Sequence, residues 1–316
     1  GEVTEQSLGH QVIVNGWVHR RRDHGGVIFV DVRDRTGLVQ LVFDPSSSDE
    51  QTMQTAHKLR AEFVVAAQGT VIARATAAIN PKLATGKIEV PVAVLQILSS
   101  SKPLPFQLDD ADNVDEEMRL KYRYLDLRRE KMHAFIKLRH EVIFAMREQL
   151  NGEGFYEIET PILSKSTPEG ARDFLVPSRL QPGTFYALPQ SPQIYKQLLM
   201  ASGMDKYFQV ARCFRDEDLR ANRQPEFTQL DIEMSFIDET KIQGLIERLL
   251  GHVFKKVFGI TIKAPFERLE YAHAFARYGS DKPDRRFALP ITEVTDLFAA
   301  TELSFLRQVI AKGGRV

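Results

Sequence analysis

Hydrophobic and polar residues follow two different periods along the chain, and the first covers residues 10–98. Alternating or β-branched runs there predict five strands, at 10–20, 27–33, 38–43, 63–74 and 88–98. Residues 48–60 open with Ser48 and two acidic residues and continue at helical spacing, which predicts a helix. The order β-β-β-α-β-β is that of an OB-fold barrel, although a generic small barrel has a similar strand count.

From Met118 onward the period is helical. An i, i+3, i+4 stripe predicts a helix with one buried face that ends at Gly152 and Gly154; its members are Phe135, Leu138, Val142, Met146 and Leu150. Later runs predict strands at 174–177, 185–188, 207–214 and 227–236, and helices at 193–202 and 241–258. This α+β pattern suits an antiparallel sheet flanked by helices.

A polar segment separates the two periods. Residues 104–117 carry six acidic residues and no basic one, which predicts a solvated linker or the approach to a helix. The pattern changes again near Asp284. We therefore expect four parts: an OB-fold domain at 1–102, a linker or hinge at 103–130, an α+β domain at 131–284 and the start of an inserted domain at 285–316.

Composition narrows the class of protein. The 42 basic and 42 acidic residues cancel, which excludes a histone-like or cationic-tail protein and leaves nucleic-acid binding to local basic patches. No apolar run exceeds five residues, so we expect a soluble, cytoplasmic chain with no membrane partner. Cys213 is the single cysteine and cannot form an internal disulfide, and no zinc-binding spacing is present.

A basic run joins the first two predicted strands. Arg20, Arg21 and Arg22 precede Asp23, His24 and two glycines, while Phe29 and Gln40 lie on the following strands. Cations can hold phosphates, a ring can stack on a base and an amide can read a base edge, on the face that OB-folds use for single strands. The alternative is a solvated turn beside a core phenylalanine.

A charged loop at 215–226 separates two further predicted strands. It can aim Arg215 and Arg223 at phosphates while Phe227 offers a ring for a purine, although most charged loops are only solvated surface. The strand that follows favours a site. Its alternation predicts one apolar face, with Thr228, Leu230, Ile232, Met234 and Phe236, and a second face with Phe227, Gln229, Asp231 and Glu233.

Several segments of the sequence, including this charged loop, resemble those of a known family. Residues 214–217 (Phe-Arg-Asp-Glu) and 223–229 (Arg-Gln-Pro-Glu-Phe-Thr-Gln) resemble motif 2 of the class II aminoacyl-tRNA synthetases, in particular the aspartyl-tRNA synthetases of bacterial type. Residues 154–161 resemble motif 1, 167–173 (Thr-Pro-Glu-Gly-Ala-Arg-Asp) the mobile flipping loop, 188–197 the amino-acid-binding segment and 121–128 the hinge. The resemblance covers about residues 10–316.

The resemblance implies an aspartate–tRNA ligase, which activates L-aspartate with ATP and transfers it to tRNA(Asp). It implies that Lys196 neutralises the substrate's side-chain carboxylate. The ammonium group of the aspartate substrate would be held by Glu169, Ser191, Gln193 and Asp231. Arg215 would be catalytic, because it bridges the α-phosphate of ATP and the reacting carboxylate.

The resemblance also implies a nucleotide site. ATP would be bound by Arg215, Asp216, Glu217, Gln224 and Phe227, with Mg²⁺ on its phosphates and Glu233 as a candidate metal ligand. Motif 1, with Pro161, implies a homodimer.

For the anticodon, the resemblance implies that Phe29 stacks on a base, that Gln40 and Glu89 read base edges and that Arg20, Arg21 and Arg22 hold the backbone. His24, together with Ala77 where strict members place a lysine, favours an enzyme that also charges tRNA(Asn).

One part of the family pattern has no counterpart. Motif 3, and a second arginine that grips the aspartate side chain, would lie beyond Val316. We therefore expect either a piece of a longer enzyme or a truncated protein that has lost ligase activity, and we expect residues 1–316 alone to be inactive. An asparaginyl enzyme and a non-catalytic tRNA-binding module remain alternatives, whereas Lys196 disfavours a lysyl enzyme because a cation would repel lysine.

Overall fold

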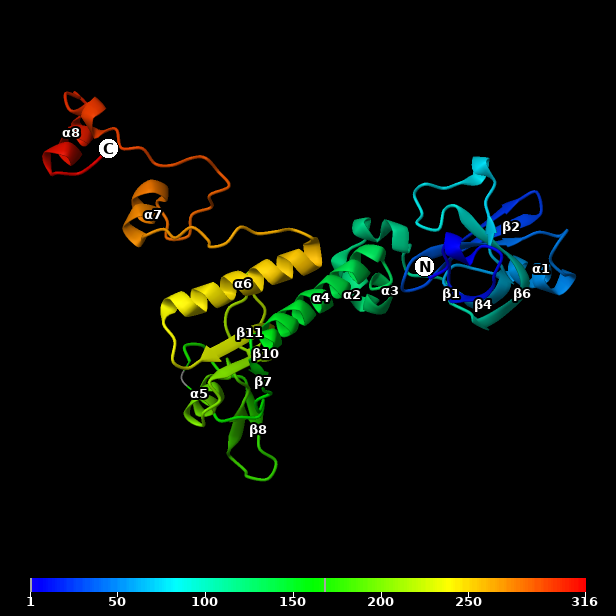
Figure 1. Cartoon of the computed structure of the whole chain (residues 1–316), viewed down its shortest axis with the longest axis horizontal. Coiled ribbons are helices and arrows are strands. Elements are labelled where there is room, and N and C mark those ends of the chain that lie inside the picture. The colour runs from blue at the N-terminus through cyan, green and yellow to red at the C-terminus, as the bar shows by residue number, and fades with distance from the viewer. Residues whose placement is uncertain (1, 168) are drawn as a thin grey trace. The chain divides into compact units, whose positions relative to one another are not determined.

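A computed structural model describes residues 2–167 and 169–316, and the chain divides into two compact units. The first ends at Arg129 and the second begins at Glu130 (Figure 1). The finer division at 102, 130 and 284 stays a prediction.

The first unit is a closed β-barrel. Its elements are η1 (Glu5–Ser7), β1 (Gln11–His24), β2 (Val27–Arg33), β3 (Leu38–Phe43), α1 (Glu50–Lys58), β4 (Val64–Thr70), β5 (Ile72–Ala73), η2 (Thr76–Ala78) and β6 (Ile88–Ser99). The strands pair in the order β3-β2-β1-β4-β6-β5, and a parallel pairing of β3 with β6 closes the barrel, as in the predicted OB-fold. The predicted strand 63–74 is divided into β4 and β5. Alternate residues such as Ile28 and Leu41 fill the interior.

The basic run lies on a strand and not in a loop, which corrects the expectation for residues 20–24. β1 continues through His24, and Arg20, Arg22 and His24 pair with Asp31, Phe29 and Val27 of β2. Only Gly25 and Gly26 form the turn, with φ of 63° and 92°. Two consecutive positive φ angles are what the tightest hairpin turns require, so a glycine pair allows both strands to run to the tip.

The segment after the barrel is folded and leads into a helix, so of the two alternatives predicted for residues 104–117 the approach to a helix is correct and the solvated linker is not. It forms η3 (Leu108–Asn113), α2 (Glu116–Lys121) and α3 (Arg123–Asp126). Phe106, Ala111 and Leu125 make a small apolar cluster between them. These contacts bury apolar area, which a mobile linker would leave in water.

A buried carboxylate attaches the end of this segment to the barrel. The Glu62 side chain is 2% exposed and accepts hydrogen bonds from Arg33 at 2.8 Å and from Arg128 at 2.6 Å. The Arg128 guanidinium also lies over the Trp17 ring, 5.2 Å from its centroid. Two cations satisfy the charge that burial would otherwise penalise.

The second unit contains a small sheet between helices. Its elements are α4 (Glu130–Gly152), β7 (Tyr156–Glu157), β8 (Leu175–Pro177), β9 (Phe185–Ala187), α5 (Gln193–Ala201), β10 (Lys206–Phe214), β11 (Glu226–Met234), α6 (Glu239–Phe258), α7 (Tyr271–Tyr278), η4 (Thr295–Phe298) and α8 (Ser304–Ala311). β10 and β11 pair antiparallel, as predicted for this sheet, but β7 joins β10 in parallel. β8 and β9 form a separate hairpin.

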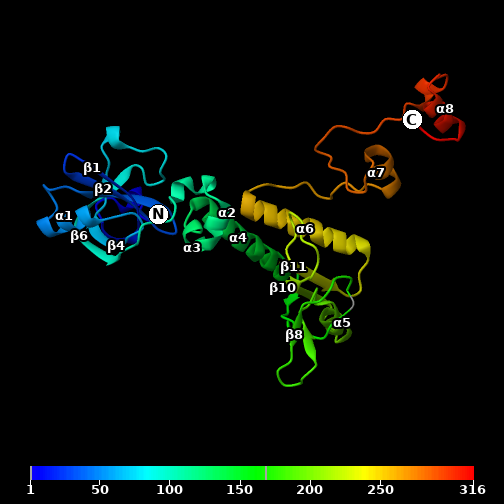
Figure 2. The same ribbon diagram turned by 180° about the vertical axis from the view of Figure 1, so that it is seen from behind.

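Helices cover both faces of this sheet. α4 and α6 lie side by side and pack against one face, where Leu150, Phe208 and Leu249 are buried (Figures 1 and 2). α5 contacts β10 and β11. The predicted stripe of α4 is buried only toward its C-terminal end, because Leu150 is inaccessible whereas Phe135 is 54% exposed. None of the described helices is long and apolar enough to span a membrane.

The Glu62 contacts generate a stability prediction. Glu62→Gln leaves two arginines without a buried counter-charge, so the free energy of unfolding of the chain should fall by about 3 kcal/mol in urea titrations. The matched control is Glu116→Gln, an exposed position on α2, which should change stability by less than about 0.5 kcal/mol. Equal small effects of the two variants would show that the buried carboxylate contributes nothing.

Candidate active site

The centre of the site is a buried ion pair between α5 and β11. Lys196 Nζ lies 2.9 Å from Asp231 Oδ1 and 3.3 Å from Glu233 Oε2, and the Lys196 side chain is 12% exposed. Strand alternation explains the contact. Leu230, Ile232 and Met234 face the core beneath α4 and α6, so Asp231 and Glu233 point to the opposite face.

Both charges are stabilised by their neighbours. Burial acts to lower the pKa of the Lys196 ammonium, but its hydrogen bonds to Asp231 and Glu233 and the charges of these carboxylates outweigh burial and raise that pKa. Lys196 is therefore protonated at neutral pH. Asp231 also accepts a 3.2 Å hydrogen bond from Gln229, while its Oδ2 is buried with no hydrogen bond to the described residues. Such an oxygen is a ready acceptor for a ligand's donor.

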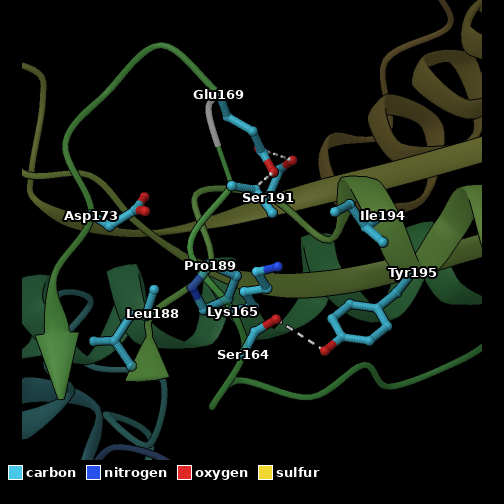
Figure 3. Close-up of a pocket in the computed structure, with 11 residues that line it drawn as sticks. Ser164, Lys165, Glu169, Asp173, Leu188, Pro189, Ser191, Ile194 and Tyr195 are labelled. Carbon is cyan, nitrogen blue, oxygen red and sulfur yellow. Dashed lines mark hydrogen bonds between the residues drawn. The ribbon is translucent and has the colours of Figure 1, made fainter. Parts of the chain in front are cut away.

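Glu169, which lies in a loop, contacts the segment that leads into α5. Ser191 Oγ donates to Glu169 Oε2 at 2.7 Å, and Thr167 Oγ1 donates to Glu169 Oε1 at 2.9 Å. Figure 3 shows Glu169 above Ser191, at the rim of a pocket that Ser164 and Tyr195 also line. Gln193 begins α5 one turn before Lys196, so the two share a helix face. Pro168 of the predicted flipping loop lies outside the described residues.

A second, larger pocket has the residues predicted for a nucleotide. It has a volume of about 370 Å³ and is lined by Arg215, Glu217, Arg223, Gln224 and Phe227, among others. The Arg215 guanidinium lies over the Phe227 ring, 5.1 Å from its centroid. One face of this ring is thus covered, and a purine could stack only on the other.

Asp216 lies apart from that pocket lining. Its backbone N–H donates to the carbonyl of Arg172 at 3.0 Å, and its carboxylate is 3.7 Å from the Arg172 guanidinium. The structure therefore joins Asp216 to the loop at 167–173, which the sequence did not indicate.

The predicted metal ligand is already paired. Glu233 contacts Lys196, and the described residues contain no cluster of three or more His, Cys, Asp or Glu side chains that could hold a metal ion.

In the barrel, the predicted anticodon residues form a hydrogen-bonded row. Arg22 donates to Asp31 at 2.8 Å and to Gln40 at 3.2 Å, and Gln40 in turn donates to Glu89 at 3.0 Å. Phe29 lies directly across the hairpin from Arg22. The side chains of β1, β2, β3 and β6 thus meet on one face, in positions held by one another before any ligand binds.

The remaining predicted barrel residues lie around this row. The rings of His24 and Phe29 are tilted at a centroid distance of 6.0 Å. Arg21 contacts Asp23 and His57 at 3.3 Å, Arg20 is exposed, and Ala77 is exposed on η2.

Pro161 follows β7 in a largely exposed segment. Tyr156, Ile162 and Leu163 beside it are 66%, 46% and 55% exposed. A cluster of exposed large apolar side chains is typical of a surface that another chain covers.

Comparison with known families agrees with this arrangement. A family model described as "tRNA synthetases class II (D, K and N)" matches residues 115–303. The chain belongs to the class II tRNA synthetases. A second model, described as an OB-fold nucleic acid binding domain, matches residues 12–98, which confirms the predicted fold of the barrel.

Individual class II synthetases resemble the whole chain. An aspartate–tRNA(Asp/Asn) ligase of Geobacillus sp. (strain WCH70) is 55% identical over 316 residues, all of this chain and 53% of the relative. The ligase of the same name from Thermodesulfovibrio yellowstonii is 56% identical over 315 residues and is also covered to 53%. The chain thus spans about half the length of these curated relatives.

Solved class II synthetases share the fold. The asparaginyl-tRNA synthetase from Pyrococcus horikoshii, in complex with asparaginyl-adenylate, superposes with a TM-score of 0.72 at 28% sequence identity. The match covers 82% of this chain and 57% of that one.

Three residues were not predicted individually, one in the barrel and two in the class II synthetase unit. Asp31 and Gln190 are buried polar residues that make several hydrogen bonds, and Arg172 joins the loop to Asp216. For Asp31, the alternation of residues 27–33 was the available signal, because it places Asp31 on the same strand face as Phe29.

Proposed function

We propose that this chain supplies the anticodon-binding domain and the motif 2 half of the active site of an aspartate–tRNA ligase. The observation that carries the proposal is the buried ammonium of Lys196 beside Asp231 and Glu233. The names of the two bacterial relatives support the same activity.

Lys196 would select the amino acid. Its charge is buried, so a side-chain carboxylate adds a charged acceptor to the ammonium, whereas the neutral amide of asparagine is a weaker acceptor and sets N–H donors beside the cation, at a cost of several kcal/mol. The nearby carboxylates keep the ammonium protonated until substrate arrives. The same charge would reject lysine.

The carboxylates would orient the substrate by its ammonium group. Asp231 Oδ2 accepts no hydrogen bond from the described residues and could accept one from the substrate, and Glu169, Ser191 and Gln193 would supply the further polar contacts. A substrate held by both ends presents its α-carboxylate in one direction, which lowers the entropic part of the barrier.

The pocket around Arg215 and Phe227 would hold ATP, with Glu217 and Gln224 as further contacts. An oxygen of the aspartate α-carboxylate attacks the α-phosphorus, the bond to pyrophosphate breaks, and aspartyl-adenylate forms. Arg215 stabilises the negative charge that gathers in this step. The 3′-hydroxyl of the tRNA then attacks the activated carbonyl and AMP leaves.

A magnesium ion fits this site only as a partner of the nucleotide. Mg²⁺ is usually bound by one or two carboxylates, waters and substrate phosphates, and Glu233 could supply one such oxygen. When bound, the ion would neutralise phosphate charge.

The barrel would bind the anticodon of tRNA(Asp). Phe29 offers a ring for stacking, Gln40 and Glu89 are held with their polar atoms at the same face, and Arg20 and Arg21 lie along its edge. Ala77 removes a contact that could exclude one anticodon, so we also propose tRNA(Asn) as a substrate.

We further propose a cytoplasmic homodimer. Pro161 and the exposed apolar residues around β7 and on α4 would form its two-fold interface.

Substitution of Lys196 tests the proposed activity. In the full-length protein, Lys196→Ala should lower kcat/KM for aspartate in ATP–pyrophosphate exchange at least about 100-fold, because a buried charge contact to the substrate is lost. Lys241→Ala, at an exposed position of α6, is the matched control. Aspartate activation within about tenfold of the parent enzyme, or roughly 1.4 kcal/mol, would contradict the assignment.

Charging of purified tRNAs tests the proposed breadth. The full-length enzyme should aminoacylate tRNA(Asp) and tRNA(Asn) at comparable rates, and His24→Leu should shift the ratio because His24 lies against Phe29. A preference for tRNA(Asp) above about a hundredfold, some 2.7 kcal/mol, would exclude dual specificity.

A further inference from the structure

Gln190 is a buried residue that touches neither proposed substrate pocket. It lies between β9 and α5, directly before Ser191, and is 2% exposed. A buried amide is costly unless its donors and acceptor are satisfied. The hydrogen-bond partners of Gln190 therefore indicate its structural role.

All the hydrogen bonds of this amide go to one short segment. Its Oε1 accepts from the Ala171 backbone N–H at 3.0 Å, and its Nε2 donates to the Ala171 carbonyl at 2.9 Å and to Asp173 Oδ1 at 2.5 Å. A side chain that binds both polar groups of one residue fixes that residue's position and orientation, as a β-bridge does.

The segment held in this way carries Glu169, two residues before Ala171. Glu169 accepts a hydrogen bond from Ser191, the residue next to Gln190. The same two segments are therefore joined at neighbouring positions, by Gln190 with Ala171 and by Ser191 with Glu169. The loop is also attached at Arg172, whose carbonyl accepts a 3.0 Å hydrogen bond from the Asp216 backbone N–H and whose guanidinium lies beside the Asp216 carboxylate. The two side chains are 76% and 48% exposed, and exposed ion pairs of this kind contribute little, so the buried amide is a stronger side-chain restraint than this ion pair.

We propose that Gln190 is a positioning residue that holds loop 169–173 closed over the aspartate site. It acts through Ala171 and Asp173 and places the Glu169 carboxylate where the substrate ammonium group binds. This inference rests on the proposed aspartate activation, because the loop's task is defined by that substrate.

Two variants of the full-length protein test it. Gln190→Glu keeps the shape but loses both N–H donors and sets a negative charge beside Asp173. Gln190→Met removes the hydrogen bonds without adding charge. In each, KM for aspartate in pyrophosphate exchange should rise at least about tenfold, while KM for ATP stays within about twofold. Gln51→Glu, an exposed position on α1, is the matched control.

A rescue and a loop assay separate positioning from general structure. Asp173→Asn in the Gln190→Glu background supplies a donor to the new carboxylate and should recover part of the lost aspartate affinity. Tryptic cleavage after Arg172 should accelerate at least about tenfold in both single variants, because cleavage follows the open population.

The outcomes are distinct. If the parent protein does not activate aspartate, the proposed function fails. If it does, and both variants keep KM for aspartate within about twofold, the positioning role of Gln190 is refuted. It is also refuted if the variants lose thermal stability and impair both substrates equally without faster cleavage after Arg172, since Gln190 would then be only a core residue.

Discussion

The ion pair between Lys196 and Asp231 is the interaction on which the site depends. It joins α5 to β11, and it exists because β11 alternates between an apolar face and a polar one. Pairs of this kind are expensive to bury, and a fold keeps them only when further partners satisfy them. Here Glu233 and Gln229 do so, which leaves Asp231 Oδ2 for a ligand. The polar groups of the proposed aspartate site are therefore held in place before any ligand binds.

The barrel uses the same principle with different residues. The row from Arg22 through Asp31 and Gln40 to Glu89 holds polar groups on one face, while alternate residues fill the interior. Arg22 thus forms hydrogen bonds within the protein, to Asp31 and Gln40, and these bonds orient Gln40. Both proposed binding surfaces consist of polar residues whose positions are fixed by their neighbours.

Much of this arrangement could be predicted from local pattern. The bounds of β2 and β3 and the two faces of β11 follow from period-two alternation. The run at 20–24 was misassigned to a loop because consecutive charges resemble solvated surface, whereas the glycine pair alone makes the turn. Phe236 was placed on the strand face, but it follows β11 with φ of 58° and is 92% exposed. Gln190 could not be identified, because its hydrogen bonds to the loop come from tertiary packing.

The proposed activity depends on selection of a carboxylate side chain by the buried ammonium of Lys196. ATP–pyrophosphate exchange by the full-length protein, with L-aspartate and L-asparagine compared as substrates, tests it most directly. We expect a kcat/KM for aspartate at least about 100-fold above that for asparagine, because the neutral amide offers the buried ammonium a weaker acceptor than a carboxylate and sets N–H donors beside a cation. Equal activation of the two amino acids, or a preference for asparagine, would contradict it.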